Sequence, residues 1–228
     1  MSLAVVLGPA LADLAERLDR TGAVDPGAAA PGTAASGDAV AVRVRGATES
    51  ATDRRGALRA ILDDGVDTVL VIDTAAPARP DWRRGARLAL VADHISLTGS
   101  NPLVGANDDA WGPRFPDLTD AWDPRLRREL RAAAANARLE LREGIVAAVT
   151  SDQLTAAELA MLRTLGADMA STGFADEAIV ARHAGRRVVG IAALATSFSD
   201  AMGADELAGL EALLRAVLPV LVSAGRAA

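Results

Sequence analysis

Apolar residues occur along this chain in short runs separated by amphipathic segments, and this alternation predicts strands that alternate with helices. Apolar runs typical of buried strands cover residues 3–7, 40–44, 68–72, 87–91, 145–149, 167–171 and 188–194. Helical spacing of apolar residues covers 11–18, 54–64, 124–139, 155–165, 177–183 and 205–222. This order predicts an α/β fold, a three-layer α/β/α sandwich with a mostly parallel central sheet.

Two segments interrupt the alternation. Residues 22–37 are rich in Gly, Ala, Pro and Ser and have too little apolar bulk to pack, which predicts a mobile loop. Residues 96–122 form a long polar segment, and a loop of that length inside a compact domain is usually functional. No internal repeat is visible, so we expect residues 1–228 to form one domain.

Composition excludes several classes of chemistry. The net charge of −6 argues against nucleic acid or an anionic membrane as a partner. The chain has no Cys and no Lys, which excludes disulfides, thiol nucleophiles and Schiff-base lysines. Neither a signal segment nor an apolar run long enough to span a bilayer is present, so we expect a cytoplasmic protein. We expect no metal site and no organic cofactor.

The titratable residues outside the strands have simple structural interpretations. His183 closes a predicted helix and is expected to be a surface residue or a cation at the helix C-terminus. Turn formation explains residues 107–109, Asn-Asp-Asp, better than acid catalysis does. Glu49 stands among small polar residues and is expected to be solvated rather than a general base. Glu177 is expected to be an acid in the first turn of a helix.

The segment from Asp93 to Trp122, DHISLTGSNPLVGANDDAWGPRFPDLTDAW, is the most distinctive part of the chain. It resembles, almost residue for residue, the signature of the trimeric purine nucleoside phosphorylases. Three shorter blocks, 65–71, 165–168 and 177–183, also resemble that family, and the likeness extends over about residues 4–220.

The resemblance implies a reaction, an assembly and several structural roles. Family members cleave a purine nucleoside with phosphate, giving the free base and ribose 1-phosphate without a metal or organic cofactor. By the same resemblance, Asp93 and His94 fix the geometry of the signature loop. Phe115 stands where the family's Phe covers the nucleoside bound by the neighbouring subunit of a trimer.

The residues aligned with the family's ligand sites have nevertheless changed. Pro9 replaces a phosphate-binding Ser and offers neither a hydroxyl nor an N–H group, while Ala47 and Glu49 replace an Arg and a His. The positions aligned with the phosphate site are Pro9, Ala47, Glu49, Thr74 and Gly173. The positions aligned with the nucleoside site are Ala51, Gln153, Leu154, Thr172, Thr196 and Ala204.

These changes favour a degenerate family member in which no catalytic residue is retained and phosphorolysis is weak or lost. Three alternatives stay open: an active phosphorylase or hydrolase with a rebuilt site, a non-catalytic protein that binds a purine or nucleoside weakly, and a non-catalytic subunit. We expect a homotrimer, or a hetero-trimer with an active paralogue, because the segment around Phe115 is intact.

Overall fold

A computed structural model describes residues 2–14, 17, 40–46, 49–63, 65–83, 87–195 and 203–224. The loop predicted at 22–37 lies outside these residues. All seven predicted strands are present. They are β1 (Ser2–Leu7), β2 (Val40–Val44), β3 (Val66–Pro77), β4 (Leu88–Ser96), β5 (Arg142–Ala148), β6 (Met169–Ser171) and β7 (Arg187–Leu194).

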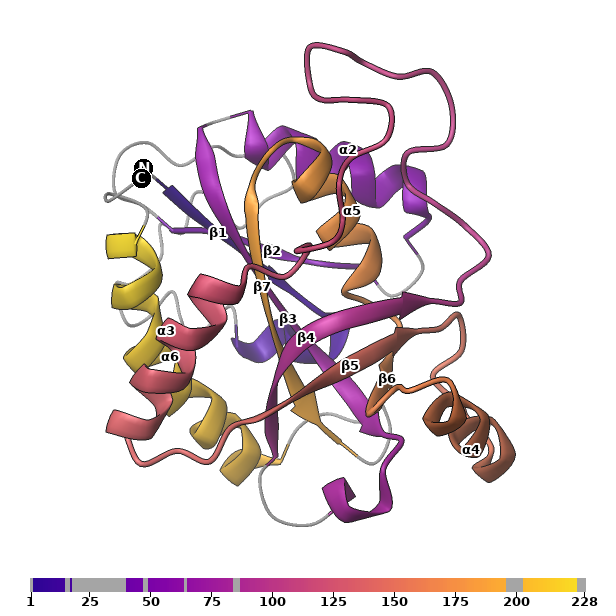
Figure 1. The fold of residues 1–228 in the computed structure, drawn as a ribbon. Helices are drawn as coiled ribbons and strands as arrows, with labels where there is room; N and C mark the ends of the chain where they lie inside the picture. Colours follow the sequence, from indigo (N-terminus) through magenta and orange to yellow (C-terminus); the bar gives the residue numbers. More distant parts are fainter. Residues whose placement is uncertain are drawn as a thin grey trace.

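Most neighbouring strands run parallel, as predicted, in the order β2-β1-β3-β6-β5-β4-β7. The β3–β6 and β4–β7 pairs are antiparallel. Strand β7 also pairs with β3 along residues 68–75, so the strands from β3 round to β7 close into a ring (Figure 1). The α/β fold is therefore confirmed, with a central sheet that curls and closes rather than lying as an open layer.

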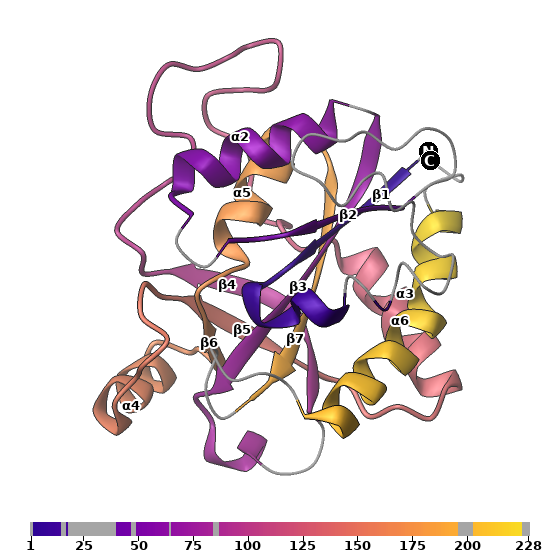
Figure 2. The same ribbon diagram turned by 180° about the vertical axis from the view of Figure 1, so that it is seen from behind.

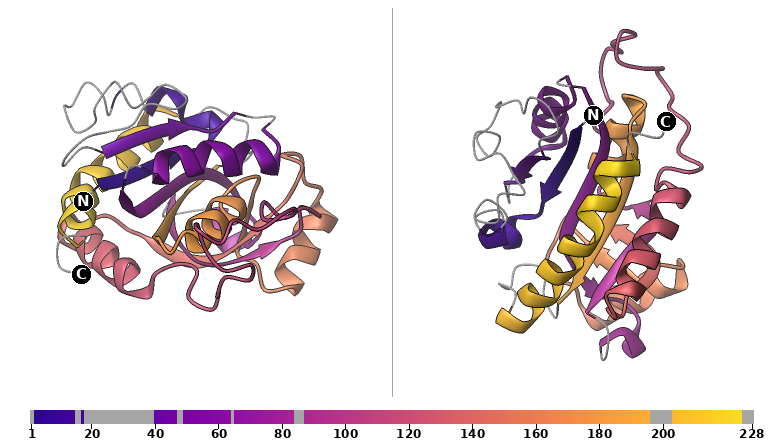
Figure 3. Two further views of the ribbon diagram at one scale, coloured as in Figure 1. Left: turned by 90° about the horizontal axis from the view of Figure 1, so that it is seen from above. Right: turned by 90° about the vertical axis from the view of Figure 1, so that its left-hand side faces the viewer.

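Helices cover both faces of this sheet. They are α2 (Ala51–Leu62), α3 (Pro124–Asn136), α4 (Ala156–Thr164), α5 (Ala175–His183) and α6 (Ala204–Ala224), with short 3₁₀ turns η1 (Pro9–Leu11) and η3 (Pro80–Arg83). Helices α3 and α6 lie side by side against one face, and α2 and α5 pack together on another (Figures 1 and 2). Seen from the side, α6 follows the outside of the strands (Figure 3).

The alternation of side chains along the strands explains this arrangement. Leu3, Val5 and Leu7 of β1 join the core beneath α3 and α6, whereas Ala4 and Val6 join the core beneath α2 and α5. Successive residues of a strand point to opposite faces, so one apolar run supplies both cores. None of the described helices is long and apolar enough to cross a bilayer.

Two helices begin with the same local device. In α4, the Thr155 side chain accepts from the Glu158 amide while the Glu158 side chain accepts from the Thr155 amide, which is a capping box. In α2, Ser50 and Asp53 form the equivalent box. The α2 box starts the helix at Ala51, three residues before the predicted start at 54, and fixes the first turn of α2 beside the ends of the strands.

After β4, the rest of the signature segment, residues 97–122, runs past α2 and α5 as a long loop (Figure 1). Arg59 of α2 stacks on Trp111 and forms an ion pair with Asp108 at 2.5 Å. A Cβ atom at Gly112 would collide with the His183 carbonyl oxygen, so the loop backbone touches the end of α5. His183 is buried and approaches Asn107, so its prediction as a surface residue is wrong: the loop covers it.

Candidate functional site

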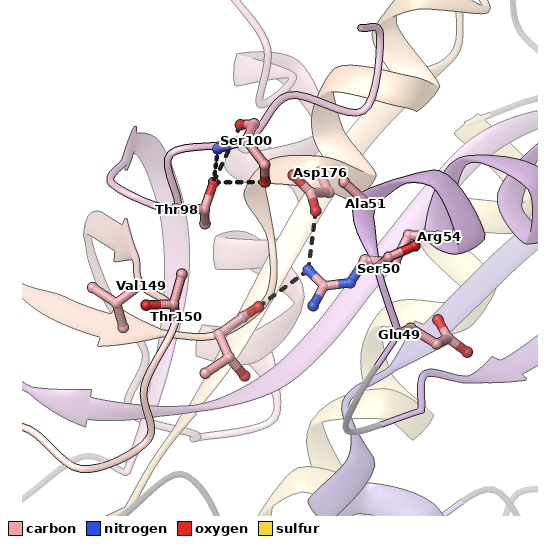
Figure 4. A pocket seen from close by; sticks show the side chains of 10 residues that line it. Glu49, Ser50, Ala51, Arg54, Thr98, Ser100, Val149, Thr150 and Asp176 are labelled. Atoms are coloured by element: carbon pink, nitrogen blue, oxygen red, sulfur yellow. Dashed lines mark hydrogen bonds and ion pairs between the residues drawn. The ribbon is translucent and has the colours of Figure 1, made fainter.

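A cavity of about 390 Å³ opens where the carboxyl ends of several strands meet the first turn of α2 (Figure 4). Ligands of α/β proteins with parallel strands, in open sheets and in closed barrels, bind at this edge, because the loops that follow the strands converge there. The lining combines hydroxyls with two carboxyls and a guanidinium: Glu49, Ser50, Ala51, Arg54, Thr98, Ser100, Val149, Thr150, Thr172 and Asp176.

Three of the residues aligned with the family's ligand sites line this cavity: Glu49, Ala51 and Thr172. The capping box of α2 explains the placement of the first two, since Ser50 stands between them. Thr172 follows β6 directly, and its carbonyl accepts hydrogen bonds from both Arg45 and Arg54.

Other aligned positions lie elsewhere. Gln153 is exposed, and Leu154 packs against the small core under α4, so neither lines the cavity. Ala47 and Thr196 lie outside the described residues, and Ala204 is the first residue of α6. Thr74 and Gly173 border the Asp73 carboxylate, and Pro9 follows Gly8, which also borders it.

Glu49 is held at the rim of the cavity by its neighbours. Its carboxylate accepts from Arg43 at 2.6 Å and from the Gly46 amide at 3.0 Å. Partial burial would raise the pKa of Glu49, but these hydrogen bonds and the charges of Arg43 and Arg45 outweigh it and lower the pKa below its ordinary value. Glu49 is therefore an anion at neutral pH.

A buried ion network lies behind the cavity. Arg45 follows β2 and contacts the Asp73 carboxylate of β3 through Nη2, and its Nε lies 3.7 Å from Glu177 of α5. The three side chains are only 2–3% exposed. Burial and the charge of Glu177 raise the pKa of Asp73, although Arg45 and the Thr74 amide, which donates to it at 2.8 Å, act the other way.

A second ion pair joins this network to the cavity wall. Arg54 donates to Asp176 at 3.1 Å, and both line the cavity (Figure 4). Burial, followed by the charge of Glu177, raises the pKa of Asp176, and Arg54 opposes the shift. In the described part of the chain, Asp176 Oδ1 and both Glu177 carboxylate oxygens are buried without a hydrogen-bond partner.

The backbone closes tightly around the Asp73 carboxylate. A Cβ atom at Gly8 would collide with Asp73 Oδ1, and one at Gly173 would collide with Asp73 Oδ2. Ser171 fixes the strand end by donating to the Thr74 carbonyl at 2.7 Å and accepting from the Gly173 amide at 3.2 Å. Glycine is therefore required at both 8 and 173 for the carboxylate to fit.

The ion network was missed by sequence reasoning. Glu177 does lie in the first turn of α5, as predicted, but it is buried against Arg45 instead of facing solvent. The available signal was a charged residue inside or directly after an apolar strand, as at Asp73 in β3 and Arg45 after β2. Such a residue needs a buried partner, but its identity depends on tertiary structure.

Two residues of the signature segment, Thr98 and Ser100, line the cavity, whereas His94, Phe115 and Trp122 do not. His94 Nδ1 accepts a hydrogen bond of 3.1 Å from Trp122 Nε1, which ties the end of β4 to the end of the loop, and Asp93 accepts from the His94 amide. Phe115 is 86% exposed and lies beside a second hollow of about 330 Å³ near Leu118 and Ile179. Among the described residues, no group of His, Asp and Glu side chains could hold a metal ion.

Comparisons with known proteins agree with this fold. The family model described as "Phosphorylase superfamily" matches residues 4–217. Purine nucleoside phosphorylase 1 of Geobacillus stearothermophilus is 39% identical over 131 residues, covering 57% of this chain and 47% of the relative. The rat purine nucleoside phosphorylase is 42% identical over 137 residues, covering 55% of this chain and 45% of the relative.

These matched regions span about half the length of the curated relatives. The structure of a Schistosoma purine nucleoside phosphorylase in complex with guanosine gives a TM-score of 0.77 at 23% identity, covering 95% of this chain and 88% of that one. That likeness shows a shared fold across nearly the whole chain. The family model and the curated relatives show that the chain belongs to the phosphorylase superfamily and, within it, to the purine nucleoside phosphorylase family.

Proposed function

We propose that this member of the family binds a purine base or nucleoside in the 390 Å³ cavity and has lost phosphorolysis. The observation that carries the proposal is the charge of the cavity wall. Its lining has two carboxyl groups, Glu49 and Asp176, but one guanidinium, Arg54, which is already paired with Asp176. Such a wall has no net positive charge, so it cannot balance the charge of a phosphate dianion.

The phosphate positions implied by the resemblance support the same conclusion. Pro9 has no N–H group to donate, and Gly173 has no side chain. Glu49, at the position of a family His, adds an anion whose own donors, Arg43 and Gly46, are already engaged. Each lost charge-assisted hydrogen bond weakens phosphate binding by about 1.5–3 kcal/mol, so the loss of several removes millimolar affinity.

The cavity still suits an uncharged ligand. Its hydroxyls, from Ser50, Thr98, Ser100, Thr150 and Thr172, both donate and accept hydrogen bonds. Leu154, at the position of the family's acidic purine reader, packs against the α4 core. A site without that acid discriminates poorly between substituents on a purine ring. We therefore expect weak binding with little preference between guanine and adenine.

The assembly we propose is a trimer of this chain, or a mixed trimer with an active paralogue. Phe115 supports it: an aromatic side chain 86% exposed on a loop anchored to α2 and α5 suits contact with another subunit. In either trimer Phe115 would cover the nucleoside site of its neighbour.

The decisive experiment incubates the purified protein with inosine, guanosine and adenosine, with and without phosphate, and measures free base by chromatography. We expect no phosphate-dependent release of base, and a thermal shift with purines but none with phosphate. Release that depends on phosphate would establish an active phosphorylase, and release without phosphate would establish a hydrolase. Either result contradicts the proposed function.

A matched pair of variants locates the binding. Ala51→Trp fills the cavity at the first residue of α2, and Ala156→Trp makes the same change at the first residue of α4, behind an equivalent capping box. The purine-dependent thermal shift should disappear in Ala51→Trp and persist in Ala156→Trp. Equal shifts in both variants would place the ligand outside this cavity.

A further inference from the structure

The described strand ends hold a buried cation that does not line the cavity. Arg45 lies behind Thr172, donating to its carbonyl at 3.1 Å and lying 3.4 Å from its hydroxyl. Thr172 lines the cavity, so one residue separates the guanidinium from the ligand space. A buried guanidinium with planar donors suits recognition of a tetrahedral oxyanion, because its N–H groups form paired hydrogen bonds.

The guanidinium of Arg45 already has an anionic partner within the protein, the Asp73 carboxylate. This carboxylate contacts Arg45 Nη2 with one oxygen and accepts from the Thr74 amide with the other. The backbone at Gly8 and Gly173 closes over both oxygens so tightly that a Cβ at either position would collide with them. Arg45, the Thr74 amide and the backbone at the two glycines therefore form a complete binding site for an anion, which we call the anion seat. The Asp73 carboxylate occupies it.

We propose that Asp73 is an internal occupant of an anion seat built by Arg45, the Thr74 amide and the glycines at 8 and 173, and that it excludes external oxyanions from this site. The proposal rests on the proposed function and deepens it. The cavity in front of the seat takes uncharged ligands, and a ligand with a phosphate group at this end is refused.

The charges around the seat support the exclusion. Two guanidiniums, Arg45 and Arg54, face the three carboxyls of Asp73, Asp176 and Glu177. An external dianion would add to an excess of negative charge in a site shielded from water, where like charges repel strongly. Removal of the Asp73 carboxyl leaves two carboxyls beside the two guanidiniums, which removes the excess of negative charge, and it leaves space between the two glycines.

The test uses Asp73→Ser, which removes the charge and most of the bulk. Thermal unfolding is followed with sulfate, and separately with inorganic phosphate, against chloride at equal ionic strength. We expect a saturable stabilisation of Asp73→Ser with a half-maximal concentration on the order of a few millimolar, about tenfold or more below any response of the wild type. Asp81→Ser, the same change in an exposed ion pair, should respond as the wild type does.

Arg45 is tested in the same background. Asp73→Ser with Arg45→Met should lose the response to sulfate, because the seat then lacks its cation. Asp73→Ser with Glu177→Gln should be stabilised at a lower sulfate concentration than Asp73→Ser alone. Glu177 is the remaining carboxyl group beside Arg45, 3.7 Å from its Nε, and the second substitution removes it. If Asp73→Ser does not respond, or if removing Arg45 leaves the response unchanged, the proposal is overturned.

Two further results keep the test decisive. If Asp73→Ser is unfolded in chloride, sulfate should restore the folded state by mass action, and failure to do so overturns the proposal. A wild type that binds sulfate as tightly as Asp73→Ser also overturns it. Phosphate-dependent release of base by the wild type would instead overturn the proposed function, whatever the variants do, so the two failures are distinguishable.

Discussion

Arg45 and Asp73 are almost completely buried, so each depends on the other for compensation of its charge. Arg45→Met should lower the free energy of unfolding by about 3–5 kcal/mol, because it leaves a carboxylate buried without its cation. Urea denaturation measures the loss. Arg79→Met breaks an exposed pair with Asp81 and should change stability little. An equal and small effect of both substitutions would show that Asp73 does not need the charge of Arg45.

Asp176 gives a prediction of pH dependence. Burial and then Glu177 raise its pKa above the ordinary value of 3.8, so the folded state holds this proton to higher pH than the unfolded state does. Stability from this group therefore falls as the pH rises from about 4 through the raised pKa. The free energy of unfolding of Asp176→Asn, minus that of the wild type, should rise across this window and level off above it.

The control variant, Asp81→Asn, should show a pH dependence of stability with the opposite sign. The hydrogen bond from Arg79 lowers the pKa of Asp81, so its carboxylate stabilises the folded state above the ordinary pKa, and that contribution is lost as the pH falls. Relative to wild type, Asp81→Asn should lose stability as the pH rises through the region below 3.8. Parallel pH profiles for the two variants would contradict the assignment of Asp176 as a carboxyl with a raised pKa.

At the scale of the element, the first turn of α2 couples helix stability to the cavity. Ser50→Ala removes the helix cap and should cost about 1 kcal/mol. It should also weaken purine binding, because Ser50 and its neighbours Glu49 and Ala51 line the cavity. Thr155→Ala removes the equivalent cap of α4 and should cost a similar amount without affecting binding. Calorimetry on both variants separates the two effects.

The signature loop depends on close backbone contact with α5. Gly112→Ala introduces a methyl group that would collide with the His183 carbonyl, so the loop must move away. We expect a loss of stability of about 1–3 kcal/mol from this overpacking. Gly56→Ala, in α2 with no atom near the added methyl, should instead stabilise the protein by up to about 1 kcal/mol. Chemical denaturation of both variants tests the contact.

Sequence reasoning located the elements better than the site. Apolar runs identified every strand of the described residues, but β3 and β4 extend past their predicted ends because Asp73, Thr74, Asp93 and His94 continue the strands with polar residues. Asp73 and Thr74 have buried hydrogen-bond partners that allow the strand to continue through them. The pattern of apolar residues in the sequence does not reveal such partners. Of the positions that the resemblance aligns with the family's ligand sites, Glu49, Ala51 and Thr172 line the cavity.

The buried network could not be predicted in the same way. Arg45 and Asp73 stand 28 positions apart, and their contact depends on how β2, β1 and β3 lie in the sheet. Gln153 and Leu154, aligned with the family's nucleoside site, do not line the cavity, because the segment after β5 leads into α4.

At the scale of the whole molecule, the exposed Phe115 leads to a prediction of assembly. The protein should run as a trimer by multi-angle light scattering, alone or with its paralogue. Phe115→Ala should leave the fold intact, because the side chain is exposed within its own subunit, and should weaken purine binding in the trimer. A monomer at micromolar concentration would contradict both forms of the assembly.

The closed ring of strands sets an order for folding. Thr68 of β3 pairs with Arg187 of β7, so one edge of β3 stays open until the chain has been synthesised well past its middle. During translation, β1, β2 and β3 can pair early. The backbone amides on the other edge of β3 have no partner until β7 has been synthesised. Contacts between distant segments slow folding, and an open strand edge invites pairing with other chains. The nascent protein is therefore most exposed to aggregation just before residues 187–194 leave the ribosome.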